Sequence, residues 1–153
     1  MKQGLRNDAA STESQDCRFC TGIAHRVIAA NGLAFAIRDA FPVTPLHSLV
    51  IPHRHIPDFF GLTPEEREAC AELLHRLRID ILREDAQVAG FNIGINAGQV
   101  AGQTIFHSHI HLIPRRQGDV LNPRGGVRMV IPHKGQQMLD VCPFSQEPGA
   151  SST

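Results

Sequence analysis

The sequence predicts an α+β domain with an antiparallel sheet of five strands, one long helix and a short one. The prediction rests on a hairpin signal near the N-terminus, a long amphipathic helix with a clear start, and short apolar runs on both sides of that helix. Strands followed by one long helix and then by more strands indicate this fold class. The 153 residues, 42% of them apolar, suffice for one globular core.

Three strands are expected before the helix. Residues 26–30 and 33–37 are short apolar runs on either side of Asn31-Gly32, the strongest short-range hairpin signal. A third strand is expected over residues 47–51, because prolines stand before and after it and cannot donate to a central ladder. His47 is the first residue of that strand.

The long helix is expected to begin at Pro64 and to end near Glu84. Thr63 and Glu66 have the spacing of a capping box, and proline suits the first helical position. The apolar residues at helical spacing are Cys70, Leu73, Leu74, Leu77 and Ile81. One face of this helix should therefore pack on the sheet.

Two strands are expected after the helix, over residues 91–96 and 105–113, with Pro114 ending the second. A loop that contains glycine connects them. Residues 1–15 are expected to form a polar tail and residues 16–116 the folded domain. Residues 117–153 are expected to form a basic extension that ends in a second polar tail at 143–153.

Charge and hydropathy exclude several classes of protein. The 15 Lys and Arg balance the 15 Asp and Glu, which argues against a protein whose whole surface binds nucleic acid or anionic membrane. No apolar run is long enough to span a membrane, and the N-terminus lacks the apolar core of a signal peptide, so a cytoplasmic protein is expected. The unusual feature is nine His beside no Trp and no Tyr.

His107, His109 and His111 alternate along the expected fifth strand. Their imidazoles should point to one face, about 6.6 Å from one to the next. Metal ligation and phosphoryl chemistry are both open, although one ion cannot bind the first and third, which would lie about 13 Å apart. A row of imidazoles suits a phosphate anhydride, because the central one can attack phosphorus while its neighbours donate hydrogen bonds.

Cys17 and Cys20 form a Cys-x-x-Cys pair, which permits either zinc or a redox dithiol. A thioredoxin-type motif opens a helix straight after a buried strand, whereas a polar tail precedes this pair, so zinc is favoured. Zinc needs two further ligands, which must come from distant parts of the chain. Cys70 and Cys142 are expected to be inert small hydrophobic residues.

The motif HSHIHLI resembles the His-x-His-x-His signature of the histidine-triad (HIT) superfamily of nucleotide hydrolases and transferases. The segments RDAFPVTPLHSLVIPHRHI and NAGQVAGQTIFH are similar to the family's strand-loop-strand element and phosphate loop, so the resemblance covers residues 16–116. GDVLNPRGGVR resembles an extension in a bacterial, diadenosine polyphosphate hydrolase-like branch. Ser108 departs from the signature, which usually has an apolar residue there. Because Ser is small and faces away from the imidazoles, the fold and chemistry should survive.

The resemblance implies roles for the matching residues. His109 would be the nucleophile that forms a nucleotidyl-histidine intermediate, and His111 would bond the phosphate and the leaving group. His107 would brace the site, and His47 would orient the triad. The matching substrate-binding positions are Asp39 for the ribose hydroxyls and Asn96, Gln103 and Thr104 for phosphate oxygens. Turn and loop chemistry is the alternative for the last three.

The resemblance also implies a closed, structural zinc site of two cysteines and two histidines, as in some branches of the superfamily. The matching ligands are Cys17, Cys20, His55 and His107, and His53 competes with His55. No organic cofactor is implied. Nucleotide would be the substrate, with no nucleic acid polymer or membrane as partner, and family members usually pair as homodimers. Arg124 and Arg128 are weak candidates for binding a distal phosphate or second nucleoside.

The implied function is a nucleotide hydrolase or nucleotidyl transferase that cleaves a phosphoanhydride or phosphoramidate at the α-phosphate. Diadenosine polyphosphate-like or adenylylated compounds would be the substrates. Two other functions stay open: a nucleotide-binding regulatory module with little turnover, and a zinc-dependent hydrolase that uses the histidine row as ligands. Activity after chelation tests the last, since a zinc-activated water needs its metal.

Overall fold

The structure is a computed structural model that describes residues 16–137; the expected tails at 1–15 and 143–153 lie outside this range. The chain falls into two compact units that divide between Gln117 and Gly118. The first unit holds the sheet and the long helix. Among the described residues, no helix is both long enough and apolar enough to cross a membrane.

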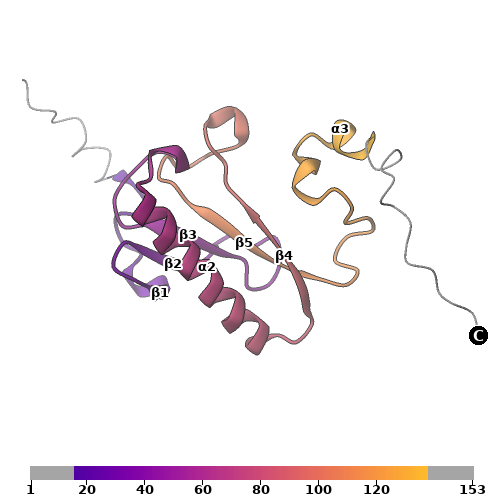
Figure 1. Ribbon diagram of the computed structural model, residues 1–153, viewed down its shortest axis with the longest axis horizontal. Helices are drawn as coiled ribbons and strands as arrows, with labels where there is room; N and C mark the ends of the chain where they lie inside the picture. Colours follow the sequence, from indigo (N-terminus) through magenta and orange to yellow (C-terminus); the bar gives the residue numbers. More distant parts are fainter. Residues whose placement is uncertain (1–15, 138–153) are drawn as a thin grey trace, which may run out of the picture. The chain divides into compact units, whose positions relative to one another are not determined.

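Five antiparallel strands form one sheet in the order β1-β2-β3-β5-β4 (Figure 1). The strands are β1 (Val27–Ala30), β2 (Ala34–Arg38), β3 (Ser48–Pro52), β4 (Val88–Gly94) and β5 (Ile110–Arg116). Short 3-10 turns are η1 (Ala24–Arg26), η2 (Phe59–Gly61) and η3 (Gln99–Ala101). The predicted α+β class is confirmed.

The predicted hairpin forms between β1 and β2. The Asn31 side-chain oxygen accepts hydrogen bonds from the backbone N–H groups of Leu33 (3.2 Å) and Ala34 (2.9 Å). The Asn31 amide also donates to the carbonyl of Ala69, which lies in the long helix. Asn31 therefore shapes the turn and ties it to the helix.

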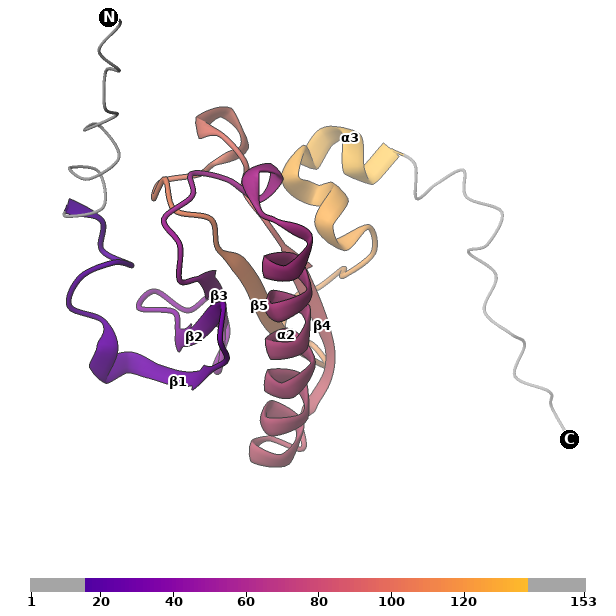
Figure 2. The ribbon, with the colours of Figure 1, turned by 60° about the vertical axis from the view of Figure 1, so that its left-hand side comes forward.

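The long helix is α2 (Pro64–Glu84), with the predicted bounds and capping box. Helix α2 packs on one face of the sheet, and Figure 2 shows it running in front of β5 and β4. Its buried apolar residues are Cys70, Leu73, Leu77 and Ile81. Because strand side chains alternate, Ala34, Ala36 and Val50 pack in the same core.

The opposite sheet face has its own core, formed by the alternate residues of β2 and β3. Phe35, Ile37, Leu49 and Ile51 cluster there with Cys17 and Phe19. The N-terminal segment therefore covers the face that α2 leaves open, which brings the Cys-x-x-Cys pair onto the sheet.

Strand β5 begins at Ile110, not at residue 105 as predicted. Ser108, which precedes β5, bonds instead to the segment after β3: its backbone N–H donates to the carbonyl of Ile56 (2.7 Å). The expected stop at Pro114 is also wrong, since β5 continues to Arg116. Proline is tolerated there because pairing with β3 extends only to Leu112.

Strand β4 begins at Val88 and ends at Gly94, earlier than predicted at both ends. Since β5 continues past Pro114, Val88 finds a partner in Arg116. The Arg116 guanidinium also pairs with Asp85 at 2.6 Å, which fixes the chain between α2 and β4.

The second unit carries the basic extension. It contains the 3-10 turn η4 (Gly126–Val130) and the short helix α3 (Pro132–Gln137). Gly125 precedes η4 with a φ of 81°, a left-handed conformation that suits glycine. One long and one short α-helix in the described residues agree with the prediction.

Candidate functional site

His109 is buried just before β5, and the backbone holds its ring. Its Nδ1 lies 2.8 Å from the carbonyl oxygen of His107. A carbonyl only accepts hydrogen bonds, so the neutral ring carries its proton on Nδ1 and its lone pair on Nε2. His109 lines a pocket, and Nε2 is its only ring nitrogen left to meet a ligand.

His111, the one histidine within β5, bonds to His47. His111 Nδ1 lies 3.0 Å from His47 Nε2, and the backbone N–H of Val43 donates to His47 Nδ1 at 3.4 Å. In the tautomer that accepts the Val43 bond, His47 carries its proton on Nε2, and His111 then carries its own proton on Nε2. His111, with its ring centre 5.1 Å from that of His109, can therefore donate beside the free nitrogen of His109.

Both supporting imidazoles are held neutral. Burial, with help from the nearby His109 and His47, lowers the pKa of His111 to about 4. Burial also lowers the pKa of His47, although the Asp39 carboxylate acts in the opposite direction. At pH 7 these rings serve as hydrogen-bonding groups without a positive charge.

Asp39 completes this end of the site. One carboxylate oxygen accepts from the backbone N–H of Phe41 (2.9 Å), and the other lies 3.4 Å from His47 Nδ1. The ligand atoms of Asp39, His47 and His111 lie within 4.8 Å of one another, so this group also has the residue types of a metal site. Leu46, directly before His47, has a left-handed φ of 68°, a strained conformation that orients the histidine.

His107 faces a different partner set from the other two triad histidines. Its Nε2 lies 2.9 Å from the carbonyl oxygen of Pro52, so Nε2 carries the proton and Nδ1 the lone pair. That Nδ1 lies 3.5 Å from the Sγ atoms of both Cys17 and Cys20. His107 and His109 precede β5, so the three histidines do not all lie within one strand as predicted, and His107 has partners of its own.

The four residues Cys17, Cys20, His55 and His107 converge, with all ligand atoms within 4.8 Å of one another. Cys20 Sγ lies 3.3 Å from His55 Nδ1. Tetrahedral zinc with sulfur and nitrogen ligands needs ligand atoms roughly 3.6 Å apart, so the donor set fits. Burial lowers the pKa of His107 to about 4, which keeps its ring neutral as ligation requires.

His55 joins this cluster, while its competitor His53 does not. His53 Nε2 bonds to the carbonyl of Asn31 (3.1 Å), and its ring packs on Phe35. Arg54, between the two histidines, donates at 2.7 Å to both carboxylate oxygens of Glu66 in α2. This bond, the largest influence on the carboxyl, lowers the pKa of Glu66 and anchors the segment that carries His55.

The pocket at His109 and His111 has a volume of about 600 Å³. Asp39 and Thr104 also line it, together with the apolar residues Phe19, Ile23, Ile37, Phe41 and Leu49. Asn96 and Gln103 do not line it. The Gln103 side chain is buried and bonds to the carbonyls of Pro57 and Ile105 and to the N–H of Gly98, so it braces the phosphate-loop segment. The Asn96 amide donates to the carbonyl of Gly102 at 3.5 Å.

Sequence reasoning missed Arg18 and Phe19, which lie between the two cysteines. The Phe19 ring meets the edges of His107 and His109, with ring centres 5.9 and 5.3 Å apart. Arg18 lines the His109 pocket. The available signal was their position: if both cysteines approach His107, the two residues between them must approach its neighbour. Arg124 and Arg128 belong to the second unit, so their role stays a prediction.

Comparison with known proteins agrees with this geometry. The HIT domain family matches residues 21–118. Adenylylsulfatase HINT3 of Arabidopsis thaliana is 33% identical over 73% of this chain and 58% of its own. AP-4-A phosphorylase of Mycobacterium tuberculosis is 33% identical over 61% of this chain and 48% of its own.

A solved structure supports the same conclusion. The Zn-bound histidine triad family protein from Mycobacterium smegmatis has a TM-score of 0.61 and 31% identity, over 84% of this chain and 98% of its own. The family match spans most of the first unit, from the segment after the cysteines to the end of β5. With the converging histidines, this match shows that the chain belongs to the HIT domain family.

Proposed function

We propose that the protein is a nucleotide hydrolase or nucleotidyl transferase that cleaves a phosphoanhydride or phosphoramidate at the α-phosphate. The observation that carries this function is the hydrogen bond from His109 Nδ1 to the His107 carbonyl. It leaves a neutral nucleophile, Nε2, in a pocket large enough for a nucleotide. The family includes nucleotide hydrolases and transferases, and two relatives are named for cleavage of adenylyl compounds.

In the first step, the lone pair of His109 Nε2 forms a bond to the α-phosphorus. The bond from phosphorus to the leaving group breaks, and its electron pair stays with the leaving atom. His111 donates a hydrogen bond from Nε2 that stabilises the negative charge on that atom. His47 supports this role because its Nε2–H holds His111 Nδ1 as an acceptor.

In the second step, water or another acceptor attacks the same phosphorus. The nitrogen–phosphorus bond breaks, its electron pair returns to His109 Nε2, and the acceptor's proton passes to solvent. Asp39 binds the ribose hydroxyls at the pocket wall, while the apolar residues beside it enclose the base. Thr104 is the phosphate-loop residue that reaches the pocket, and Gln103 shapes that loop.

Zinc is the ion that suits the cluster of Cys17, Cys20, His55 and His107. The bound ion would close a tetrahedral structural site and would supply folding energy, with no position open for water. His107 thus ties the N-terminal segment to the backbone carbonyl that fixes His109. The solved Mycobacterium smegmatis relative is named as Zn-bound, which supports this ion.

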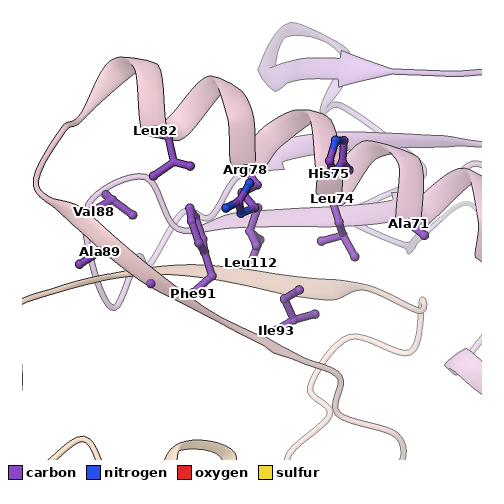
Figure 3. A pocket seen from close by; sticks show the side chains of 11 residues that line it. Ala71, Leu74, His75, Arg78, Leu82, Val88, Ala89, Phe91, Ile93 and Leu112 are labelled. Atoms are coloured by element: carbon purple, nitrogen blue, oxygen red, sulfur yellow. The ribbon is translucent and has the colours of Figure 1, made fainter. Parts of the chain in front are cut away.

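The functional protein is a homodimer that pairs through α2 and β4. A pocket of about 600 Å³ lies between them, and Figure 3 shows Leu74, Leu82 and Phe91 lining it. Strand β4 is an edge of the sheet, and Ile93 on it is 52% exposed. A second copy would pair with the edge strand and cover the apolar groove. Ile93→Asp should therefore yield monomers in sedimentation, and an unchanged dimer would contradict this pairing.

A single-turnover reaction tests the proposed chemistry. A substrate labelled at the α-phosphate is mixed with excess protein and the reaction is quenched in base, where a phosphoramidate bond is durable. We expect label on the wild-type protein and none on His109→Ala. Wild-type turnover without a base-stable adduct would favour direct attack by water.

The same protein and labelled substrate distinguish the proposed function from the two alternatives, a nucleotide-binding module and a zinc-dependent hydrolase. A nucleotide-binding module would bind the labelled compound but would release no product. A zinc-dependent hydrolase would lose activity after chelation even where the protein stays folded, whereas the histidine mechanism would keep it.

A further inference from the structure

The loop between β2 and β3 contains a strained residue directly before His47. Leu46 has a left-handed φ of 68°, and it is the one residue other than glycine with a positive φ in the part of the chain that the structure describes. Contacts of the Cβ atom disfavour this conformation, so the surrounding structure must hold it. The Leu46 side chain packs against the core that α2 forms with the sheet, which supplies part of that support.

The peptide that joins Leu46 to His47 is held at both of its polar ends. Its carbonyl oxygen accepts hydrogen bonds from the Arg38 guanidinium (3.2 Å) and from the Ser48 hydroxyl (2.8 Å). Its N–H donates to the carbonyl of Thr44 (3.2 Å). Because a peptide group is planar, bonds at both ends fix its orientation and therefore the point from which the His47 side chain starts.

Arg38 connects this loop to the long helix. It is the last residue of β2 and pairs across the sheet with Ser48, the first residue of β3. One guanidinium nitrogen donates to the Leu46 carbonyl and, at 2.7 Å, to the Ser48 hydroxyl. The other terminal nitrogen donates at 2.9 Å to Glu84, the last residue of α2. A planar guanidinium holds its acceptors in one geometry, so the end of α2 fixes the position of the loop.

We propose that Arg38 is a positioning residue, which holds the strained Leu46–His47 peptide and so keeps His47 bonded to His111. Arg38 does not line the His109 pocket, so it acts through His47. His47 Nε2 lies 3.0 Å from His111 Nδ1, and a shift of ~1 Å would break this hydrogen bond. The inference rests on the proposed function, in which His111 must present its Nε2–H to the leaving group.

Replacement of Arg38 by methionine removes the donors and keeps an unbranched apolar stem. With adenosine phosphoramidate as substrate, Arg38→Met should lower kcat about 10- to 100-fold, because a misplacement of ~1 Å can cost that much. KM should change far less, since the side chains that line the pocket remain. Arg83→Met is the matched control: Arg83 pairs with Asp80 of its own helix, and its loss should leave kcat unchanged.

A second substitution tests whether Arg38 acts against the strain at Leu46. Glycine adopts the left-handed region without the steric penalty of a Cβ atom. In a Leu46→Gly background, the loss of kcat caused by Arg38→Met should therefore be at least about fivefold smaller than in the wild type. An equal loss in the two backgrounds would overturn the inference.

NMR of the imidazole nitrogens separates this inference from the proposed function. The wild type should show His47 protonated on Nε2 and bonded to His111 Nδ1. Arg38→Met should shift these signals, and Arg83→Met should not. If Arg38→Met lowers the unfolding temperature but leaves the signals in place, its role is only structural and the inference fails. A wild type that turns over no adenosine phosphoramidate, while Arg38→Met still shifts the signals, would overturn only the catalytic proposal.

Discussion

His107 and His109 are two residues apart and both are buried, but the backbone holds them by opposite ring nitrogens. The Pro52 carbonyl bonds Nε2 of His107, which turns Nδ1 toward two cysteines. The His107 carbonyl bonds Nδ1 of His109, which leaves Nε2 at the pocket. Identical side chains thus become suited to different chemistry because one carbonyl in each case fixes the tautomer and the ring orientation.

The two regions differ also in what surrounds the imidazoles. Around His107, two thiols and a second histidine bring their ligand atoms to within 4.8 Å of one another and of the His107 ring nitrogen. Around His109, a hydrogen-bonded His111, a carboxylate and apolar side chains line an open pocket. One region is therefore equipped to stabilise the fold and the other to react.

Loss of the proposed nucleophile should have the largest effect. His109→Ala should abolish turnover, with kcat reduced at least about 10⁴-fold, because no other pocket group offers a free ring nitrogen beside a donor. Nucleotide affinity should change little, since the pocket walls remain. Rapid kinetics measures turnover, and calorimetry measures nucleotide binding. Substantial residual turnover would show that His109 is not the nucleophile.

Loss of the supporting donor should cost less. His111→Ala should lower kcat roughly 10²- to 10⁴-fold, the usual range for one general acid or hydrogen-bond donor. The order of the two variants is the informative result. If His111→Ala were the more damaging in the same assay, the assignment of nucleophile and donor would have to be exchanged.

Changes at the metal region should act on stability. Cys17→Ser and His55→Ala should lose bound zinc and should unfold more easily, by ~3 kcal/mol where free zinc exceeds its Kd a hundredfold. His53→Ala is the matched control, because His53 lies outside the cluster and should keep zinc. Metal analysis and thermal unfolding give both readouts. Purified, reduced wild type without zinc would contradict the assignment.

The smallest expected effect is a change in pH dependence from His111. Its pKa in the folded state, about 4, is below the ordinary value of 6.5, so the unfolded chain binds the proton more tightly. The stability that this ring contributes is present above pH 6.5 and is lost as pH falls toward 4. His111→Gln removes the titrating group, so its stability should fall less between pH 7 and 5 than that of the wild type. Urea unfolding at several pH values measures the free energy of unfolding of both proteins. The wild type and His111→Gln would show the same pH dependence if the ring is not held neutral.

The sequence by itself determined the elements whose signals are local. The turn at Asn31 and the capping box of Thr63 and Glu66 are made by hydrogen bonds between residues close in the chain. Helical spacing likewise identified the buried face of α2. The resemblance of the histidine motif to a known family could also be recognised from the sequence alone, because the motif and its flanking blocks are contiguous.

Only the tertiary structure decided how the histidine segment is used. Strand β5 starts late because residues 107 and 108 bond to Pro52 and Ile56, which are more than fifty residues away along the chain and contribute no local pattern. The Pro52 contact orients His107 to the cysteines, a bond to the Asn31 carbonyl holds His53 apart from them, and bonds to Gly98, Pro57 and Ile105 turn Gln103 into the loop. The role of each ring nitrogen depends on which carbonyl bonds to the ring, and the alternation of side chains along a strand does not predict that bond.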